Sequence, residues 1–150
     1  MLDNMVPYLL KLKSHNIKIT QERKHLIKIF LQFPEYHFTP NELYDQLKAN
    51  GYNIGFATIY RNLKLFQKIN LISSISLDDG SKKYEWNYRE VNSPVFHIHF
   101  ICSHCGKVLD YEPENNDFII PDIRSSSLFD VEDIEVQIRG ICNECIQSIK

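Results

Sequence analysis

Two kinds of metal-binding side chain lie close together in residues 95–112, which read VFHIHFICSHCGKVLDYE. His97 and His99 form a His-x-His motif, and Cys102 and Cys105 follow directly as a Cys-x-x-Cys motif. Imidazole nitrogens and thiolates are common ligands of zinc and of other first-row transition metals. The segment therefore predicts metal binding, and its spacing alone leaves open whether these side chains hold one ion or two.

All four cysteines of the chain occur in Cys-x-x-Cys pairs, Cys102 with Cys105 and Cys142 with Cys145. Each pair presents two thiolates to one ion, and two pairs complete the closed tetrahedral shell of a structural zinc. The 36 residues between the pairs exceed the spacing of a compact zinc ribbon, so we expect the pairs to meet through neighbouring strands. Thiol redox chemistry, or reduced cysteines without metal, is the alternative.

Strand geometry separates the two histidines from the cysteine that follows them. His97 and His99 share one face of a strand, whereas Cys102 shares the other face with Ile98 and Phe100. The histidines therefore need ligands from other predicted elements, where three competent side chains occur: Glu85, Asp110 and His37. Such a shell suits Fe(II), Mn(II) or Zn(II), and it weakens at acid pH because histidines bind metal only when neutral. A solvated His-x-His without metal is the alternative.

Helices and a hairpin are predicted upstream of these motifs. The clearest helix begins at Thr39, which forms a capping box with Glu42, and ends at Gly51. Thr20 caps the preceding helix, and residues 78–81 form a tight turn between two alternating strands. The predicted helices are residues 6–16, 21–33, 40–50 and 56–70, and the predicted strands are residues 71–77 and 82–87. This order is typical of a winged helix-turn-helix domain.

The pattern changes after residue 88. Residues 88–94 lack periodicity and form the predicted linker. Alternation beyond it predicts strands at residues 96–102, 107–112 and 131–142, whereas residues 113–128 carry only a weak helical pattern. We therefore expect an α+β chain of two domains, residues 1–88 and 89–150.

The charge of the chain is divided between these two parts. Residues 1–90 contain 13 basic and 9 acidic residues, whereas residues 91–150 contain 4 basic and 10 acidic ones. The basic part suits a polyanion and the acidic part suits cations or a partner, although chance also produces such a division. With 150 residues, 43% of them hydrophobic, and no leader or membrane-length apolar run, we expect a globular cytoplasmic protein and no membrane association.

Four runs of residues, taken together and in this order, are specific enough to indicate a family: GFATIYRNLKLFQKINLI, KKYEW, HIHFICSHCGKVLDYE and RGICNEC. Together they resemble the ferric uptake regulator (Fur) family of bacterial metal-responsive repressors, over nearly the whole chain. The resemblance implies a homodimer that binds a double-stranded DNA operator. It implies a winged-helix DNA-binding domain at residues 1–88, and an α/β dimerisation and metal-binding domain with a zinc-knuckle sheet at residues 89–150.

The resemblance also implies a regulatory metal site and a set of DNA contacts. The regulatory site, for Fe(II), Mn(II) or Zn(II), falls on His37, Glu85, His97, His99 and Asp110. A filled site is expected to hold the two DNA-binding halves at the spacing of a palindromic operator. The expected contacts are Tyr60 and Arg61 to bases or groove, Ala57, Thr58 and Arg23 to phosphates, and Lys18 to the minor groove.

Departures from the family pattern leave the branch of the family open. Many iron-sensing members have His-Asp-His where this chain has Ile98 between two histidines, and a further His where Ile134 stands, so we expect a third metal site to be absent. Asp110 resembles the peroxide-sensing branch, in which bound Fe(II) lets peroxide oxidise a ligand histidine. Glu85 is more like the iron-sensing branch, and zinc-sensing members share the TIYRNL run.

Three functions of different classes compete. The leading hypothesis is a metal-dependent repressor of metal-uptake or peroxide-defence genes. A zinc-dependent enzyme would need an open coordination position and a substrate cleft, and the chain has no motif such as HExxH. A constitutive, zinc-stabilised DNA-binding protein is the third reading. We therefore expect that the protein is not an enzyme, and that it has no catalytic residue and no small-molecule substrate.

Overall fold

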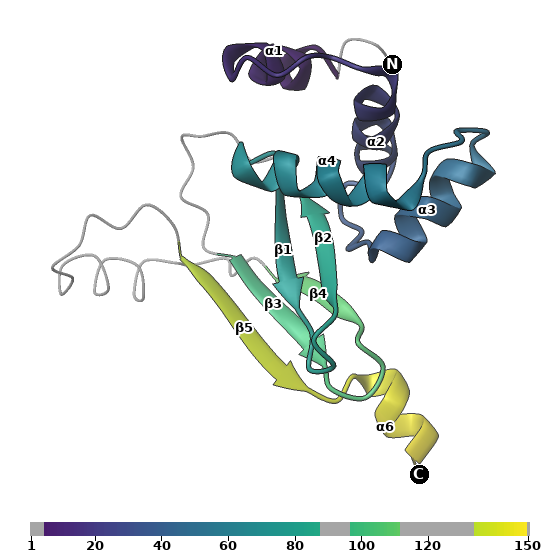
Figure 1. Ribbon diagram of the computed structural model, residues 1–150. Coiled ribbons are helices and arrows are strands. Elements are labelled where there is room, and N and C mark those ends of the chain that lie inside the picture. The colour runs from purple at the N-terminus through teal and green to yellow at the C-terminus, as the bar shows by residue number, and fades with distance from the viewer. Residues whose placement is uncertain (1–4, 88–96, 112–133, 150) are drawn as a thin grey trace, which may run out of the picture. The chain divides into compact units, whose positions relative to one another are not determined.

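Along the described residues, four helices come first, five strands follow, and a short helix is last (Figure 1). The computed structural model describes residues 5–87, 97–111 and 134–149. The chain divides into two compact units, Met1–Tyr88 and Arg89–Lys150. The predicted α+β fold is confirmed. Among the helices of the described residues, none is long and apolar enough to cross a membrane.

The first unit begins with four helices: α1 (Val6–Ser14), α2 (Gln21–Gln32), α3 (Pro40–Ala49) and α4 (Phe56–Lys68). The predicted capping box is present, because the Thr39 hydroxyl accepts from the Glu42 amide and the Glu42 carboxylate accepts from the Thr39 amide. The Thr20 hydroxyl likewise accepts from the Arg23 amide at the start of α2. These local caps explain why both helix starts could be predicted.

Three of these helices end in the same way, at a residue with a left-handed backbone. Asn16, Gly51 and Asn70 have φ of 57°, 78° and 53°. After each of them, the next amide donates 2.9 Å back to a carbonyl of the last helical turn, as Ile17 does to Leu12. This C-terminal motif uses carbonyls that would otherwise lack partners. It also ends α1 at Ser14, earlier than the predicted residue 16.

The core of the first unit is built from one face of each helix and closed by the hairpin. The fully buried side chains include Leu26, Ile27, Ile29 and Phe30 of α2, Leu43 and Leu47 of α3, and Ile59, Leu63 and Phe66 of α4. Burial of each such aliphatic or aromatic side chain stabilises the unit by about 1.5 to 3 kcal/mol before the entropy of ordering is counted. This burial holds α4 in place with its opposite face toward solvent.

The hairpin consists of β1 (Ile72–Ser76) and β2 (Lys82–Trp86), paired antiparallel. Gly80, with φ of 80°, makes the turn that the sequence predicts. β2 also pairs with the segment before α3, because Phe38 and Tyr84 exchange two backbone hydrogen bonds of 2.8 and 2.7 Å. This bridge carries the two residues beside it, His37 and Glu85, to the same place.

The second unit contains a three-stranded sheet in the order β4-β3-β5. Its elements are β3 (His97–Cys102), β4 (Val108–Tyr111), β5 (Glu135–Gly140) and α6 (Asn143–Ile149). β3 pairs antiparallel with β4 and parallel with β5, and the parallel register sets Cys102 opposite Gly140. The strand ends that carry the two cysteine pairs are therefore neighbours.

Some predicted features lie outside the described residues. They are the linker at residues 88–94, the weak helical pattern at residues 113–128, and the outer ends of the predicted strands at residues 96, 112 and 131–133. The sequence analysis did not predict α6, which begins directly after Cys142 and includes Cys145. Its length of 7 residues is too short for a clear helical periodicity.

Candidate metal centres and nucleic-acid interface

The four cysteine sulfurs converge at one end of the three-stranded sheet, with all ligand atoms within 4.8 Å of one another. The Cys102 and Cys145 sulfurs are 3.9 Å apart, as are those of Cys105 and Cys142, so all four cysteines are free thiols. A tetrahedral zinc with Zn–S bonds of about 2.3 Å needs sulfurs about 3.8 Å apart. The observed separations therefore fit a four-cysteine zinc site.

The backbone at the first cysteine pair is arranged to favour a thiolate. The Cys142 amide donates to the Cys102 sulfur at 3.3 Å. This bond, with others from the Cys102–Cys105 turn, lowers the pKa of the Cys102 thiol to about 6. Gly106 closes the turn with φ of 69°, and its amide donates 2.9 Å to the Cys102 carbonyl. Amides that stabilise a bound thiolate are a common feature of cysteine metal sites.

The second cysteine pair contains a thiol that resists ionisation, and an ion pair beside it links the second pair to the first. Hydrogen bonding to Cys142 and burial raise the pKa of the Cys145 thiol to about 12, so its proton must leave when a metal binds. Lys107 Nζ donates to Glu144 Oε1 at 2.6 Å, and this contact raises the pKa of Lys107. The exposed ion pair joins the two cysteine turns at their outer side, where such a pair contributes little stability.

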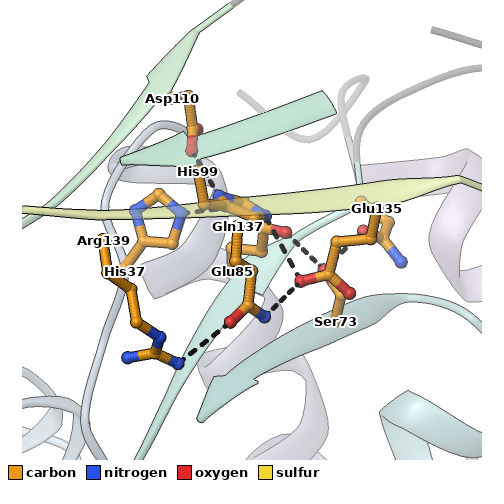
Figure 2. Close-up of polar contacts among 9 residues, drawn as sticks. His37, Ser73, Glu85, His99, Asp110, Glu135, Gln137 and Arg139 are labelled. Carbon is orange, nitrogen blue, oxygen red and sulfur yellow. Dashed lines mark hydrogen bonds and ion pairs between the residues drawn. The ribbon is translucent and has the colours of Figure 1, made fainter. Parts of the chain in front are cut away.

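A histidine and a carboxylate also meet on the sheet of the second unit. His99, 1% exposed, lies opposite Asp110 in the β3–β4 register, and its Nδ1 is 3.0 Å from Asp110 Oδ1 (Figure 2). The other ring nitrogen, Nε2, is 3.8 Å from Glu135 Oε1 on β5. Glu135 was not among the predicted ligands, because its role depends on the parallel pairing of β3 with β5.

A second histidine and carboxylate meet within the first unit. His37 Nε2 is 2.9 Å from Glu85 Oε2, and both side chains are buried, at 4% and 11% exposure. Glu85 is oriented by Ser73, which lies opposite it in the hairpin and donates to Glu85 Oε1 at 2.6 Å (Figure 2). A carboxylate fixed in this way beside an imidazole suits a metal ion that prefers nitrogen and oxygen ligands.

The predicted ligands are thus found as two pairs and one strand residue. His37 pairs with Glu85 in the first unit, and His99 pairs with Asp110 in the second. His97 is the first residue of β3, and its register partner is Glu135. The sequence does not predict a role for Ser73, because serine is common in strands and only the cross-strand register makes it a partner of Glu85.

The predicted DNA contacts lie on α4, on the connection before α2 and, in the case of Arg23, in the first turn of α2. Tyr60 is 42% exposed although it follows the fully buried Ile59, and Arg61 is also exposed. Ala57 is exposed and Thr58 is half-buried in the first turn of α4. Lys18 is exposed between α1 and α2. A face of this kind, with cationic and aromatic side chains on one helix, can enter a DNA groove.

Arg23 is arranged differently from the other predicted contacts. Its Nε donates to Asn62 Oδ1 at 3.0 Å, and its Nη1 donates to the carbonyl of Lys18. Asn62 is 6% exposed and was not among the predicted residues, because no local pattern distinguishes an asparagine within a helix. The guanidinium of Arg23 therefore contacts protein groups at two of its donors.

Comparisons with known proteins find relatives over most of the chain. Residues 14–139 match the profile of the Ferric uptake regulator family. The ferric uptake regulation protein of Campylobacter upsaliensis is 33% identical over 141 residues, which are 93% of this chain and 86% of that protein. The peroxide-responsive repressor PerR of Staphylococcus aureus (strain Mu50 / ATCC 700699) is 31% identical over 134 residues, which are 89% of this chain and 86% of that protein.

A solved structure leads to the same family. The ferric uptake regulator from Francisella tularensis, solved with iron, superposes with a TM-score of 0.71 at 28% identity, over 87% of this chain and 95% of that one. The family profile spans most of the chain, and an iron-uptake regulator and a peroxide-responsive repressor match the chain at similar identity. The chain therefore belongs to the ferric uptake regulator family, and it is a metal-dependent transcription regulator rather than an enzyme.

Proposed function

We propose that this protein is a repressor that binds a palindromic DNA operator as a homodimer when a regulatory metal is bound. The observation that carries the proposal is a histidine paired with a carboxylate in each unit, His37 with Glu85 and His99 with Asp110. We expect it to work in the cytoplasm, where bacterial operators lie. Its targets would be genes of metal uptake, metal homeostasis or peroxide defence.

A structural zinc on Cys102, Cys105, Cys142 and Cys145 is the permanent part of this proposal. It is supported by the separations of 3.9 Å between sulfurs and by the lowered pKa of the Cys102 thiol. A shell of four thiolates leaves no position open for water or substrate. Its role is to hold the two cysteine turns, and with them the ends of β3 and β5, together.

The regulatory metal is the removable part of the proposal. Its proposed ligands come from both units: His37, Glu85, His97, His99 and Asp110. Iron(II) or manganese(II) fits this mixed nitrogen and oxygen set, and zinc(II) is possible by the same chemistry. Because each unit alone supplies an incomplete set, binding would favour the arrangement of the units in which both sets reach one ion. That preference is how metal binding would control affinity for the operator.

The proposed DNA interface uses α4 in the major groove and Lys18 in the minor groove. It is supported by the exposure of Tyr60 and Arg61 on a helix whose opposite face is fully buried. Ala57 and Thr58, at the start of α4, are proposed to meet phosphate through backbone and hydroxyl groups.

A homodimer is supported by an exposed apolar face on the sheet of the second unit. Phe100 is opposite Leu109 on one side and Ile138 on the other, and residues opposite one another share a face of the sheet. These three side chains and Tyr111 are 40% to 51% exposed, although they are large and apolar. Such an exposed apolar face on the β4-β3-β5 sheet suits contact with a second copy of the chain.

The proposed function is tested by selecting double-stranded DNA from a random pool with zinc-loaded protein, with and without added Mn(II). We expect a palindromic sequence to be enriched only when Mn(II) is added to the zinc-loaded protein. No enrichment under either condition would contradict operator binding, and equal enrichment under both would support the constitutive reading. The variant His97→Ala should retain zinc and lose the response to Mn(II).

The branch of the family is tested by oxidation chemistry. Relatives named for ferric uptake regulation and for peroxide response match this chain at 33% and 31% identity, so similarity does not separate them. Protein loaded with Fe(II) should be treated with hydrogen peroxide and measured by intact and peptide mass spectrometry. A gain of one oxygen atom at His37 or His97 supports a peroxide sensor, whereas unmodified histidines support the iron or zinc branch.

A further inference from the structure

The connection that carries Lys18 is held by its neighbours on both sides. The Ile17 amide donates to the Leu12 carbonyl at 2.9 Å, which fixes the connection to the end of α1. Thr20 caps α2 on the other side, with its hydroxyl accepting from the Arg23 amide. The Lys18 side chain is nevertheless exposed. The backbone is thus fixed where the side chain is free to reach a ligand.

Arg23 links this connection to α4. Its Nη1 donates to the Lys18 carbonyl, and its Nε donates to Asn62 Oδ1 at 3.0 Å. The guanidinium is planar and its donors have fixed directions, so two bonds from one group set the distance between the two acceptors. A single side chain therefore connects the Lys18 backbone with α4.

Asn62 continues the connection within α4. It is 6% exposed, and its Nδ2 donates to the Thr58 carbonyl at 2.8 Å. Asparagine is unfavourable within a helix, so its place here needs a compensating role, and both ends of its amide are used. Arg61 Nη2 donates to the hydroxyl oxygen of the same residue, Thr58 Oγ1, at 3.2 Å. The network thus runs from Lys18 to the exposed Arg61 through three buried or half-buried residues: Arg23, Asn62 and Thr58.

We propose that Arg23 and Asn62 are positioning residues that set Lys18 at a fixed distance from the DNA-reading face of α4. This inference rests on the proposed DNA-binding function and goes beyond it. Arg23 then contributes to operator affinity through Lys18, and not through a phosphate contact of its own. Because the Lys18 backbone is already held relative to α4, less backbone entropy is lost when the lysine reaches the neighbouring groove.

A double-mutant cycle separates positioning from direct contact. Operator affinity should be measured by fluorescence anisotropy, with metal present, for Lys18→Ala, Arg23→Ala and the combined variant. We expect each single variant to lower operator affinity about tenfold per half-site. When the Lys18 side chain is already absent, Arg23→Ala should lower the affinity further by less than about threefold. The proposal would be overturned if the combined variant lost about a hundredfold in affinity, the product of two independent losses. It would also be overturned if each single variant reduced the salt dependence of binding by about one phosphate contact.

Two further variants test the geometry directly. Arg23→Lys retains the charge but has one nitrogen, which cannot keep both acceptors in place, so it should lose as much affinity as Arg23→Ala. Asn62→Ala should behave like Arg23→Ala and add little to it. Lys24→Ala, which removes the same charge from the next residue of α2, is the matched control and should change affinity less than about threefold. An affinity for Arg23→Lys equal to that of the wild type would contradict positioning.

A measurement without DNA keeps the inference distinct from the proposed function. Trypsin cleaves after exposed lysines, and the Lys18 peptide bond should be cut several-fold faster in Arg23→Ala and Asn62→Ala than in the wild type or in Lys24→Ala. Circular dichroism should confirm that the variants are folded. If the wild type binds no DNA, the proposed function fails. An unchanged cleavage rate at Lys18 contradicts the positioning network itself.

Discussion

Single residues in this protein differ in whether they suit a permanent or a removable metal. The four cysteine sulfurs form a set of one ligand type, held by backbone amides at the end of a sheet. The histidines His37 and His99 are each paired with a carboxylate, which gives mixed sets of nitrogen and oxygen. Thiolates hold zinc tightly, whereas mixed sets bind Fe(II) or Mn(II) more weakly and exchange them.

Removal of one cysteine should cost the zinc and much of the stability. We expect Cys145→Ser to lose bound zinc and to lower Tm by about 10 °C or more, because binding of a structural zinc contributes directly to folding. Zinc content by mass spectrometry and thermal unfolding by circular dichroism give both values. The exposed His104, between Cys102 and Cys105, is the control, and His104→Ala should retain the zinc. Full zinc content in Cys145→Ser would contradict the four-cysteine site.

The serine beside Glu85 offers a finer test of the regulatory metal. Ser73→Ala removes the hydrogen bond to Glu85 Oε1, and we expect affinity for Mn(II) to fall about tenfold, as loss of a group that orients a ligand does elsewhere. Calorimetric titration of zinc-loaded protein measures this affinity. Ser74→Ala is the matched control, since Ser74 accepts from Gln67 and does not contact Glu85 in the hairpin register. Equal affinities in the two variants would remove Glu85 from the proposed site.

The sequence predicted residues whose chemistry is carried by a motif and missed those whose role comes from pairing. The cysteine pairs and the His-x-His are visible in any reading of the chain. Ser73, Glu135 and Asn62 are ordinary residues in their own segments. Only the strand register gives Ser73 and Glu135 a partner, and only the hydrogen bond from Arg23 of α2 gives Asn62 its partner outside α4. Such residues need the three-dimensional structure.

At the scale of elements, local signals were the reliable ones. Thr20, Thr39 and Gly51 mark helix ends in the sequence because caps are satisfied within a few residues. The end of α1 was misplaced because Asn16, rather than a glycine, adopts the left-handed backbone there. α6 was missed because its 7 residues are too few for a clear helical periodicity.

The capping box of α3 should add stability that depends on pH. Burial opposes ionisation of Glu42, but hydrogen bonds from Thr39 and from the Tyr36 hydroxyl prevail and hold its pKa below the usual value. A lowered pKa means that the ionised carboxylate stabilises the fold above about pH 4.3, the usual value, and that this stability is lost as pH falls through the lowered pKa. The cap therefore acts fully at neutral pH.

Denaturant unfolding of two variants measures this effect. Thr39→Ala should lower the free energy of unfolding by about 1 kcal/mol at pH 7. The difference in unfolding free energy between the wild type and Glu42→Gln should be constant from pH 6 to 8, and it should shrink below about pH 4. A difference that grows on acidification would mean that the pKa of Glu42 is raised rather than lowered.

At the scale of the whole molecule, four large apolar side chains on the described sheet of the second unit are 40% to 51% exposed: Phe100, Leu109, Tyr111 and Ile138. We expect Phe100→Glu to weaken self-association by at least about a hundredfold, because a buried charge without a partner is costly at an interface. Analytical ultracentrifugation measures the association. Phe33 is the matched control, since it is the same residue type with the same 42% exposure but lies in the first unit. Equal association of Phe100→Glu and Phe33→Glu would place the dimer contact elsewhere.

The central claim is that one metal stays and a second one controls DNA binding. The most direct test is a titration of Mn(II) into zinc-loaded protein with a fluorescent operator, with anisotropy and bound metal measured on the same samples. We predict that operator affinity rises at least tenfold as about one Mn(II) per chain binds beyond the zinc, and that chelation of the Mn(II) reverses the change. An operator affinity that is the same with zinc alone and with zinc plus Mn(II) would contradict the account.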